Sequence, residues 1–388
     1  MALKAKLDAL LSEAVARADV PGVVAAVTTA DGTIYQAGFG ERERGGGVAM
    51  TPDTVGWIAS MTKALTSVAA LQLVEQGGLA LDWPAGEVVA HLDGVEVLTG
   101  FDDSGQPRTR PPVRPVTLRH LLSHTSGLGY DFWNAEIMRY QEAMNLPPVA
   151  SRQNAAIELP LLFDPGERWN YGIGIDWAGK MVEAVSGQTL GQFMQDRIFA
   201  PLGMTSTAFR PTPEMSARMA TTHARNAEGG LEPIERPVVA EPEFEMGGGG
   251  LYSNLEDYLK FIRMILNQGR AGGRQVLQPE TVADLSRNQM GDCRVGPMTT
   301  AMPGYSNDVD MLPGIEKTWG LACMINQDQA STGRSAGSLS WAGLANCYYW
   351  IDPARGIGGA YMTQILPFVD AKSYGLYLDF ESAVYSNL

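Results

Sequence analysis

The sequence predicts an α+β fold, in which an antiparallel sheet is flanked by terminal helices and carries an inserted helical domain. Strand-like runs occur near both ends of the chain, at residues 23–39 and 318–366. Helical patterns open and close the chain, and they also dominate residues 116–290. Because strands flank the helical block, the economical arrangement is one sheet built from both ends of the chain.

Length and composition are those of a globular enzyme with more than one domain. The chain has 388 residues, of which 45% are hydrophobic and 19% charged. We expect a discontinuous α/β domain over residues 1–90 and 310–388, and a mostly helical inserted domain over residues 91–309. The net charge of −14 argues against nucleic acid or an anionic membrane as a partner, although simple solubility explains it equally well. The sequence has neither a membrane-spanning apolar run nor a secretory-type apolar segment, which predicts a cytoplasmic protein.

The N-terminal third begins with an expected amphipathic helix that ends at Pro21-Gly22. Strand-like runs at residues 23–27 and 34–39 flank Asp31-Gly32, a pairing typical of a β-hairpin. Residues 92–115 are rich in Pro, Gly and Asp and predict an insertion loop. The apolar face of the opening helix is formed by Leu7, Leu10, Leu11, Ala14 and Val15.

The rest of the chain changes from helical to strand periodicity. Helices are expected at residues 118–123, 176–185, 190–198, 255–266 and 371–385. Strands are expected at residues 318–325, 339–351 and 358–366, and Asp352-Pro353 begins a turn between the last two.

Ser60 and Lys63 form an S-x-x-K motif at the start of an apolar helix that Gly77-Gly78 ends. Residues at positions i and i+3 share a helix face, so the amine lies beside the hydroxyl. We expect Ser60 at the N-cap or in the first turn, at the positive end of the helix dipole. A serine hydroxyl becomes nucleophilic when a neighbouring base takes its proton, and a lysine can act as that base when its pKa is lowered.

Chance is the alternative explanation of this motif, because serine and lysine are common. The chain has seven lysines, and Lys63 alone has a serine three residues before it. Its place at the start of a long apolar helix favours the catalytic interpretation.

Further motifs follow in an order that resembles the serine β-lactamase and penicillin-binding-protein superfamily, on the class C side. The similarity covers nearly the whole chain and implies a β-lactamase-like fold, acylation of Ser60 with help from Lys63, and no metal or organic cofactor. The motifs are Ser60-x-x-Lys63, Leu121-Leu122-Ser123-His124-Thr125-Ser126-Gly127-Leu128, Pro165-Gly166 before Tyr171, and Gly248-Gly249-Gly250-Leu251-Tyr252-Ser253.

The second box of that superfamily, Tyr-x-Asn, is matched by Tyr171 but departs from the pattern at Ile173. By resemblance Tyr171 shuttles a proton, whereas a lone tyrosine is more often an ordinary half-buried aromatic. Ile173 removes an amide that would bind a β-lactam side chain, so the resemblance does not imply true β-lactamase activity.

The third box, Lys-Thr-Gly in β-lactamases, reads Trp341-Ala342-Gly343 here, as in family VIII carboxylesterases. An indole replaces a cation, so Trp341 is expected to wall a pocket for neutral esters. Gly343 would let a substrate approach the strand closely. The resemblance places the oxyanion hole at the backbone N–H groups of Ser60 and Leu344, each typically contributing roughly 2.7–4 kcal/mol to transition-state stabilisation.

The resemblance implies a serine carboxylesterase of family VIII type that hydrolyses short-chain esters of small molecules, with weak activity on cephalosporins. Lys63 and Tyr171 share the proton transfers, and both remain candidates for the general base. Three alternatives are a β-lactamase or D-amino-acid peptidase, a transacylase, and a non-catalytic binding protein of the same fold.

Other residues mimic catalytic or metal sites. Ser335 lies in a G-x-S-x-G match, but the preceding residues are polar and a strand follows, so we expect a loop residue. His124 suggests a Ser-His-Asp triad, yet its place at a helix end predicts a structural role. His120 and His124 have i, i+4 spacing without an acidic partner between them, so no metal site is expected. The odd cysteine count predicts free thiols at Cys293, Cys323 and Cys347.

Overall fold

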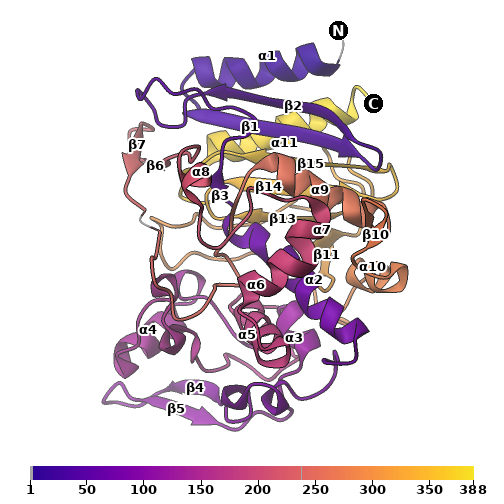
Figure 1. Ribbon diagram of the computed structural model, residues 1–388. Coiled ribbons are helices and arrows are strands. Elements are labelled where there is room, and N and C mark those ends of the chain that lie inside the picture. Colours follow the sequence, from indigo (N-terminus) through magenta and orange to yellow (C-terminus); the bar gives the residue numbers. More distant parts are fainter. Residues whose placement is uncertain (1–2, 237) are drawn as a thin grey trace.

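A seven-stranded antiparallel sheet forms the centre of the computed structural model, which describes residues 3–236 and 238–388 (Figure 1). Its strands are β1 (Gly22–Thr29), β2 (Thr33–Gly40), β11 (Lys317–Trp319), β12 (Met324–Asn326), β13 (Leu339–Gly343), β14 (Cys347–Asp352) and β15 (Ile357–Met362). Their order is β11-β12-β13-β14-β15-β1-β2, so the N-terminal hairpin extends a sheet made by C-terminal strands. Along β1, Val24 pairs with Met362 and Thr29 with Ile357. The predicted α+β fold is therefore confirmed.

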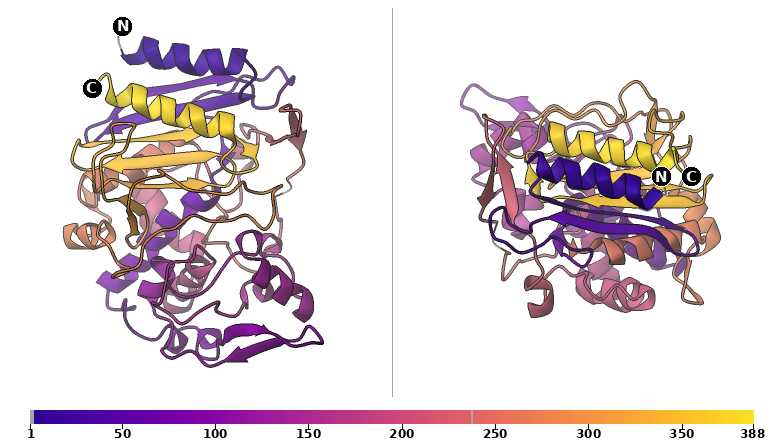
Figure 2. Two further views of the ribbon diagram at one scale, coloured as in Figure 1. Left: turned by 180° about the vertical axis from the view of Figure 1, so that it is seen from behind. Right: turned by 90° about the horizontal axis from the view of Figure 1, so that it is seen from above.

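Helices cover both faces of this sheet. The terminal helices α1 (Leu3–Ala16) and α11 (Ala371–Tyr385) lie side by side on one face, as the right-hand view of Figure 2 shows. On β14, Tyr348 stacks on Tyr377 of α11 with ring centroids 4.5 Å apart. The next residue, Tyr349, packs 5.1 Å from Tyr258 of α9 (Leu255–Leu266). Successive strand residues thus face opposite helical layers, which explains the continuous apolar run of β1.

Three expected strands proved to be pairs. Residues 318–325 form β11 and β12, and residues 339–351 form β13 and β14 around a turn at residues 344–346. Residues 358–366 split into β15 and the short β16 (Ile365–Leu366). The turn after β13 contains buried residues, with Asn346 in the left-handed region at φ 55°. The turns are short and largely buried, so Asn346 in one turn and Thr363-Gln364 in another did not separate the strands clearly in the sequence.

The helical part is organised around α2 (Thr62–Glu75), which packs against α5 (Gly174–Ser186) below the sheet in Figure 1. Helices formed at all five expected places, although residues 190–198 divide between α6 (Leu190–Met194) and a π-helical turn over Gln195–Phe199. The remaining helices are α3 (Leu118–Leu122), α4 (Ala135–Met144), α7 (Ala200–Leu202), α8 (Pro213–Ser216) and α10 (Pro279–Leu285).

Two features of residues 91–309 differ from a purely helical insertion. Residues 92–115, expected as a loop, contain a hairpin of β4 (Val97–Phe101) and β5 (Pro107–Arg110) at the far end of the molecule from α1 (Figure 1). Helix α9 packs on β1 and β15 of the central sheet. The domain boundaries given above stay a prediction.

Short pairings also join β3 (Gly56–Trp57) to β8 (Tyr252–Ser253), and β9 (Arg270–Ala271) to β10 (Arg274–Gln275).

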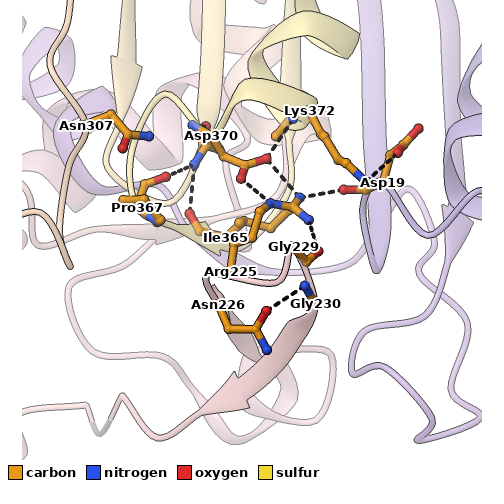
Figure 3. Close-up of polar contacts among 12 residues, drawn as sticks. Asp19, Arg225, Asn226, Gly229, Gly230, Asn307, Ile365, Pro367, Asp370 and Lys372 are labelled. Carbon is orange, nitrogen blue, oxygen red and sulfur yellow. Dashed lines mark hydrogen bonds and ion pairs between the residues drawn. The ribbon is translucent and has the colours of Figure 1, made fainter.

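A buried ion pair joins the hairpin of β6 (Thr222–Arg225) and β7 (Leu231–Ile234) to the start of α11 (Figure 3). The Arg225 guanidinium contacts the Asp370 carboxylate and also donates to the carbonyl oxygens of Asp19 and Gly229, at 2.7 and 3.0 Å. Asp370 caps α11 by accepting from the backbone N–H of Ser373 at 2.9 Å. The Arg225 guanidinium therefore links its own hairpin to two segments that are distant in sequence, at Asp19 and at Asp370.

Within residues 3–236 and 238–388, no helix combines the length and the apolarity that crossing a bilayer requires. The three cysteines are free, as predicted.

Candidate active site

Ser60 lies in a short 3₁₀ turn, Ala59–Met61, between β3 and α2. The sequence placed it at the N-cap or first turn, whereas α2 begins two residues later, at Thr62. Ala59 has a φ of 44°, an uncommon value for a residue with a side chain. The Thr62 hydroxyl holds this turn by donating to the Ala59 carbonyl at 2.6 Å. The turn brings Ser60 to the edge of a cavity while keeping it one helical turn from Lys63.

The side-chain nitrogen of Lys63 is buried and has three polar neighbours. It lies 3.2 Å from the Ser60 hydroxyl, 2.9 Å from the Tyr130 hydroxyl and 2.6 Å from the Gly248 carbonyl oxygen. A neutral amine has two N–H donors and one lone pair. The Gly248 and Tyr130 oxygens can accept both donors, which leaves the lone pair for the proton of Ser60.

Burial lowers the pKa of Lys63 to about 7, and the nearby carboxylate of Asp176 acts in the opposite direction. Burial also raises the pKa of Asp176, which the Lys63 charge counteracts. Asp176 accepts from the Gly248 N–H at 2.8 Å and lies 3.4 Å from the Tyr130 hydroxyl. Asp176, at the start of α5, thus contacts two of the three polar neighbours of Lys63, Tyr130 and Gly248. A substantial fraction of Lys63 is neutral near pH 7.

Tyr171 lies on the other side of Lys63, with the Lys63 nitrogen 4.6 Å from its ring centroid. Its hydroxyl accepts a 2.9 Å hydrogen bond from the indole N–H of Trp341. Burial raises the pKa of Tyr171 well above its usual range, while hydrogen bonds from Ser60 and Trp341 to the phenolate act in the opposite direction. Tyr171 is therefore a protonated phenol at neutral pH, beside the Ser60 hydroxyl.

The pocket residues expected from the sequence take different positions. Trp341 is buried behind Tyr171, with ring centroids 4.8 Å apart, and also packs on Trp319 at 4.6 Å. Ile173 is fully buried at the N-terminus of α5. Neither residue lines the two cavities that adjoin Ser60 and Tyr171, so their role as pocket walls stays a prediction.

Gly343 has a structural reason to be glycine. A Cβ atom there would lie 2.2 Å from the Ile58 carbonyl oxygen, so β13 passes directly against the backbone that precedes Ser60. Leu344 follows, and it lines the same cavity of about 340 Å³ as Ser60. The two proposed oxyanion-hole residues therefore face one cavity, because Gly343 permits this close approach.

Tyr171 lines a second cavity of about 580 Å³. Its walls come from the segment around Trp169 and from residues 290–299, and Trp133 closes one side. The two cavities share no lining residue: Tyr171 lines this one, and Ser60 lines the smaller one.

A family model described as Beta-lactamase matches residues 7–383. The chain belongs to the Beta-lactamase family. It is 32% identical to monacolin J acid methylbutanoyltransferase of Aspergillus terreus, over 98% of this chain and 95% of the relative. Lovastatin esterase of Penicillium rubens is 30% identical, over 94% of each chain. The structure of a simvastatin synthase variant from Aspergillus terreus superimposes with a TM-score of 0.84 at 32% identity, covering 98% of this chain and 96% of that one.

These relatives confirm the resemblance to the serine β-lactamase and penicillin-binding-protein superfamily that the motifs indicated. The chain has the β-lactamase-like fold in a family whose members include acyltransferases and esterases.

Ser335 lies in the loop between β12 and β13 and lines neither of the two cavities. Its backbone N–H donates to Asp352, and the preceding Arg334 forms a buried ion pair with Glu381 of α11. The loop therefore anchors the sheet to α11.

His124 is also buried, and its Nδ1 atom accepts from the Gly172 N–H at 3.4 Å. In the described part of the chain no three His, Cys, Asp or Glu side chains are grouped as metal ligands.

Sequence reasoning did not identify Tyr130, Asp176 or the Gly248 carbonyl as parts of the site. Gly248 lies in the motif quoted above, and a Cβ atom there would lie 2.5 Å from Asp176 and 2.6 Å from Tyr130. Asp176 could have been noticed as a buried carboxylate in the first turn of α5, close after Tyr171. Tyr130 has no comparable signal, because its role depends on a contact across 67 residues of sequence.

Proposed function

We propose that this protein transfers acyl groups of small carboxylic esters through an acyl-enzyme on Ser60, with hydrolysis as the main outcome. Such an enzyme is a serine carboxylesterase of the family VIII type. The observation that carries this proposal is the 3.2 Å contact between the Ser60 hydroxyl and the buried Lys63 amine. A base with a pKa near the working pH is the one most effective in general base catalysis.

In the first half-reaction the Ser60 oxygen attacks the ester carbonyl and its proton passes to the neutral Lys63 amine. The backbone N–H groups of Ser60 and Leu344 stabilise the resulting oxyanion. The tetrahedral intermediate then collapses and the C–O bond to the alcohol breaks. The alkoxide takes a proton from the Tyr171 phenol, which is replenished from the Lys63 ammonium, so the neutral amine is regenerated.

In the second half-reaction water attacks the carbonyl carbon of the acyl-enzyme. Its proton passes through the Tyr171 hydroxyl to the Lys63 amine, which is the reverse of the path to the leaving alcohol. A carboxylic acid leaves, and Ser60 regains its hydrogen. Tyr171 suits this shuttle because its phenol is protonated at rest and lies beside Ser60. Lys63 is thus the base, and Tyr171 is the relay that serves the leaving group.

Transfer to an alcohol in place of water is the second candidate. Two observations support it: a relative named as a methylbutanoyltransferase at 32% identity, and the cavity of about 580 Å³ that adjoins Tyr171. An alcohol that occupies this cavity would compete with water for the acyl-enzyme.

Turnover of p-nitrophenyl butyrate, with and without an added alcohol, tests both candidates. Ser60→Ala should abolish turnover, whereas Ser335→Ala, the matched serine outside the site, should retain it. Tyr171→Phe should lower kcat by about 100-fold or more if the phenol carries protons. Formation of the butyrate ester of the alcohol would show acyl transfer. Full turnover by Ser60→Ala, or a phosphonate adduct mapped to another residue, would refute the proposal.

A further inference from the structure

Two arginines line the cavity of about 340 Å³ that contains Ser60. Arg152 follows a 3₁₀ turn, Val149–Ser151, and its side chain is buried at 3% exposure. Arg236 lies just beyond β7 and is partly buried. Guanidinium groups at a reaction centre are typical of sites that recognise carboxylates.

Neither arginine forms an ion pair among the residues that the structure describes, although the charge of Arg152 is close enough to lower the pKa of Asp176. Arg236 donates to the Tyr252 hydroxyl at 2.9 Å, and its guanidinium stacks on Trp57 at 3.2 Å from the ring centroid. Both of these partners are neutral. Arg152 forms neither an ion pair nor a side-chain hydrogen bond within the described residues.

Two other arginines with little exposure are neutralised. Arg334 has the carboxylate of Glu381, and Arg225 has that of Asp370. A buried charge without a partner is costly, so folded chains normally provide one. Burial lowers the pKa of Arg236, and the charge of Arg152 acts in the same direction. Arg152 and Arg236 have no such ion pair among the described residues.

Two carboxylates also line the cavity, and neither pairs with the arginines. Asp131 is buried and accepts from the backbone N–H groups of Phe132 and Val149, at 2.9 and 3.4 Å. Glu235 is exposed, so solvent screens its charge. Positive charge therefore remains available on the wall of the cavity.

We propose that Arg152 and Arg236 form a carboxylate-binding subsite beside Ser60, and that the substrate is an ester bearing its own carboxylate. This inference rests on the proposed function. It differs from the expectation of neutral esters, which followed from Trp341 standing where β-lactamases have a cation. Here β13 lacks that cation, and two other segments supply positive charge to the same cavity.

Pairs of esters that differ only in charge test the subsite without any variant. For the acyl side, mono-p-nitrophenyl adipate is compared with p-nitrophenyl adipamate, its neutral amide. For the alcohol side, the butyrate ester of 3-(4-hydroxyphenyl)propanoate is compared with that of the corresponding amide. We expect kcat/KM to favour the anionic member of one pair by roughly 10-fold or more. The pair that shows it identifies which part of the ester carries the carboxylate. Equal kcat/KM within both pairs would overturn the subsite.

Variants of the two arginines then test whether they cause the preference for the anionic ester. Arg152→Gln and Arg236→Gln should each reduce the anionic-to-neutral ratio of kcat/KM, while Arg152→Lys should retain part of it. Arg287→Gln is the matched control, because this arginine is 64% exposed and pairs with Asp284 at the surface. An unchanged ratio in both cavity variants would overturn the subsite even if the parent prefers anions. If Ser60→Ala abolishes turnover of all four esters, the proposed function stands whatever happens to the ratio.

Discussion

The indole N–H of Trp341 donates a 2.9 Å hydrogen bond to the hydroxyl oxygen of Tyr171. This contact occupies one lone pair of the phenol and turns its own proton away from the indole, towards Ser60. Trp341 is buried and lies behind Tyr171, so it acts through the tyrosine. In our proposed mechanism Trp341 is a positioning residue, which the expectation of a pocket wall did not foresee.

Replacing Trp341 with phenylalanine should lower kcat by about 3- to 10-fold, because one neutral hydrogen bond is worth roughly 0.5–1.5 kcal/mol. KM should change less, since the ring does not line the cavity that contains Ser60. Trp350→Phe is the matched control: this tryptophan is also buried in the sheet, and its indole N–H has no partner among the described residues. Steady-state kinetics on p-nitrophenyl butyrate measures both variants. Equal losses of kcat would contradict the positioning role.

The pH dependence of kcat/KM should report the titration of Lys63. The neutral amine is the active form, so protonation removes the base and activity falls about tenfold per pH unit below the midpoint. With the pKa of Lys63 lowered to about 7 by burial, kcat/KM should rise through neutral pH and level off above it. A profile flat between pH 5 and 9 would exclude Lys63 as the base.

Asp176→Asn should move this midpoint to lower pH. The Asp176 carboxylate raises the pKa of Lys63, and an amide oxygen can still accept from the Gly248 N–H while the charge is gone. A merely structural role would change the rate and leave the midpoint in place. Asp379→Asn serves as the control, because Asp379 is exposed on α11. A midpoint that stays fixed or rises would mean that Asp176 does not act on Lys63.

Local patterns predicted the hairpin, most helices and the S-x-x-K pair, because each depends on residues close in sequence. Helix α9 was expected at its observed bounds, since its apolar periodicity and the Asn254 cap are both local. The network around Lys63 was not predictable in this way. Tyr130 and Gly248 reach Lys63 across 67 and 185 residues, and only the packed fold brings them together. Buried turns such as the one at Asn346 were missed because one polar residue between two apolar runs does not by itself distinguish a turn from a continuous strand.

Gly343→Ala should reduce both activity and stability. The new Cβ atom would lie 2.2 Å from the Ile58 carbonyl oxygen, so β13 must move away from the segment that holds Ser60. We expect kcat to fall by about 10-fold or more, because displacements near 1 Å strongly impair positioned groups. Gly375→Ala is the contrasting control: it lies within α11 with open space around it and should stabilise the fold by about 0.5–1 kcal/mol. Normal kinetics in Gly343→Ala would show that this close approach is dispensable.

The ion pair between Arg225 and Asp370 should contribute more to stability than any exposed pair (Figure 3). Asp370→Asn retains an oxygen that can cap α11 but leaves Arg225 unpaired at 12% exposure, so we expect a loss of roughly 3 kcal/mol or more in the free energy of unfolding. The control is Asp284→Asn, which breaks an exposed pair with Arg287 and should cost less than about 1 kcal/mol. Urea unfolding followed by circular dichroism gives both midpoints. Similar shifts in the two variants would mean that the Asp19 and Gly229 carbonyl oxygens satisfy Arg225 without the carboxylate.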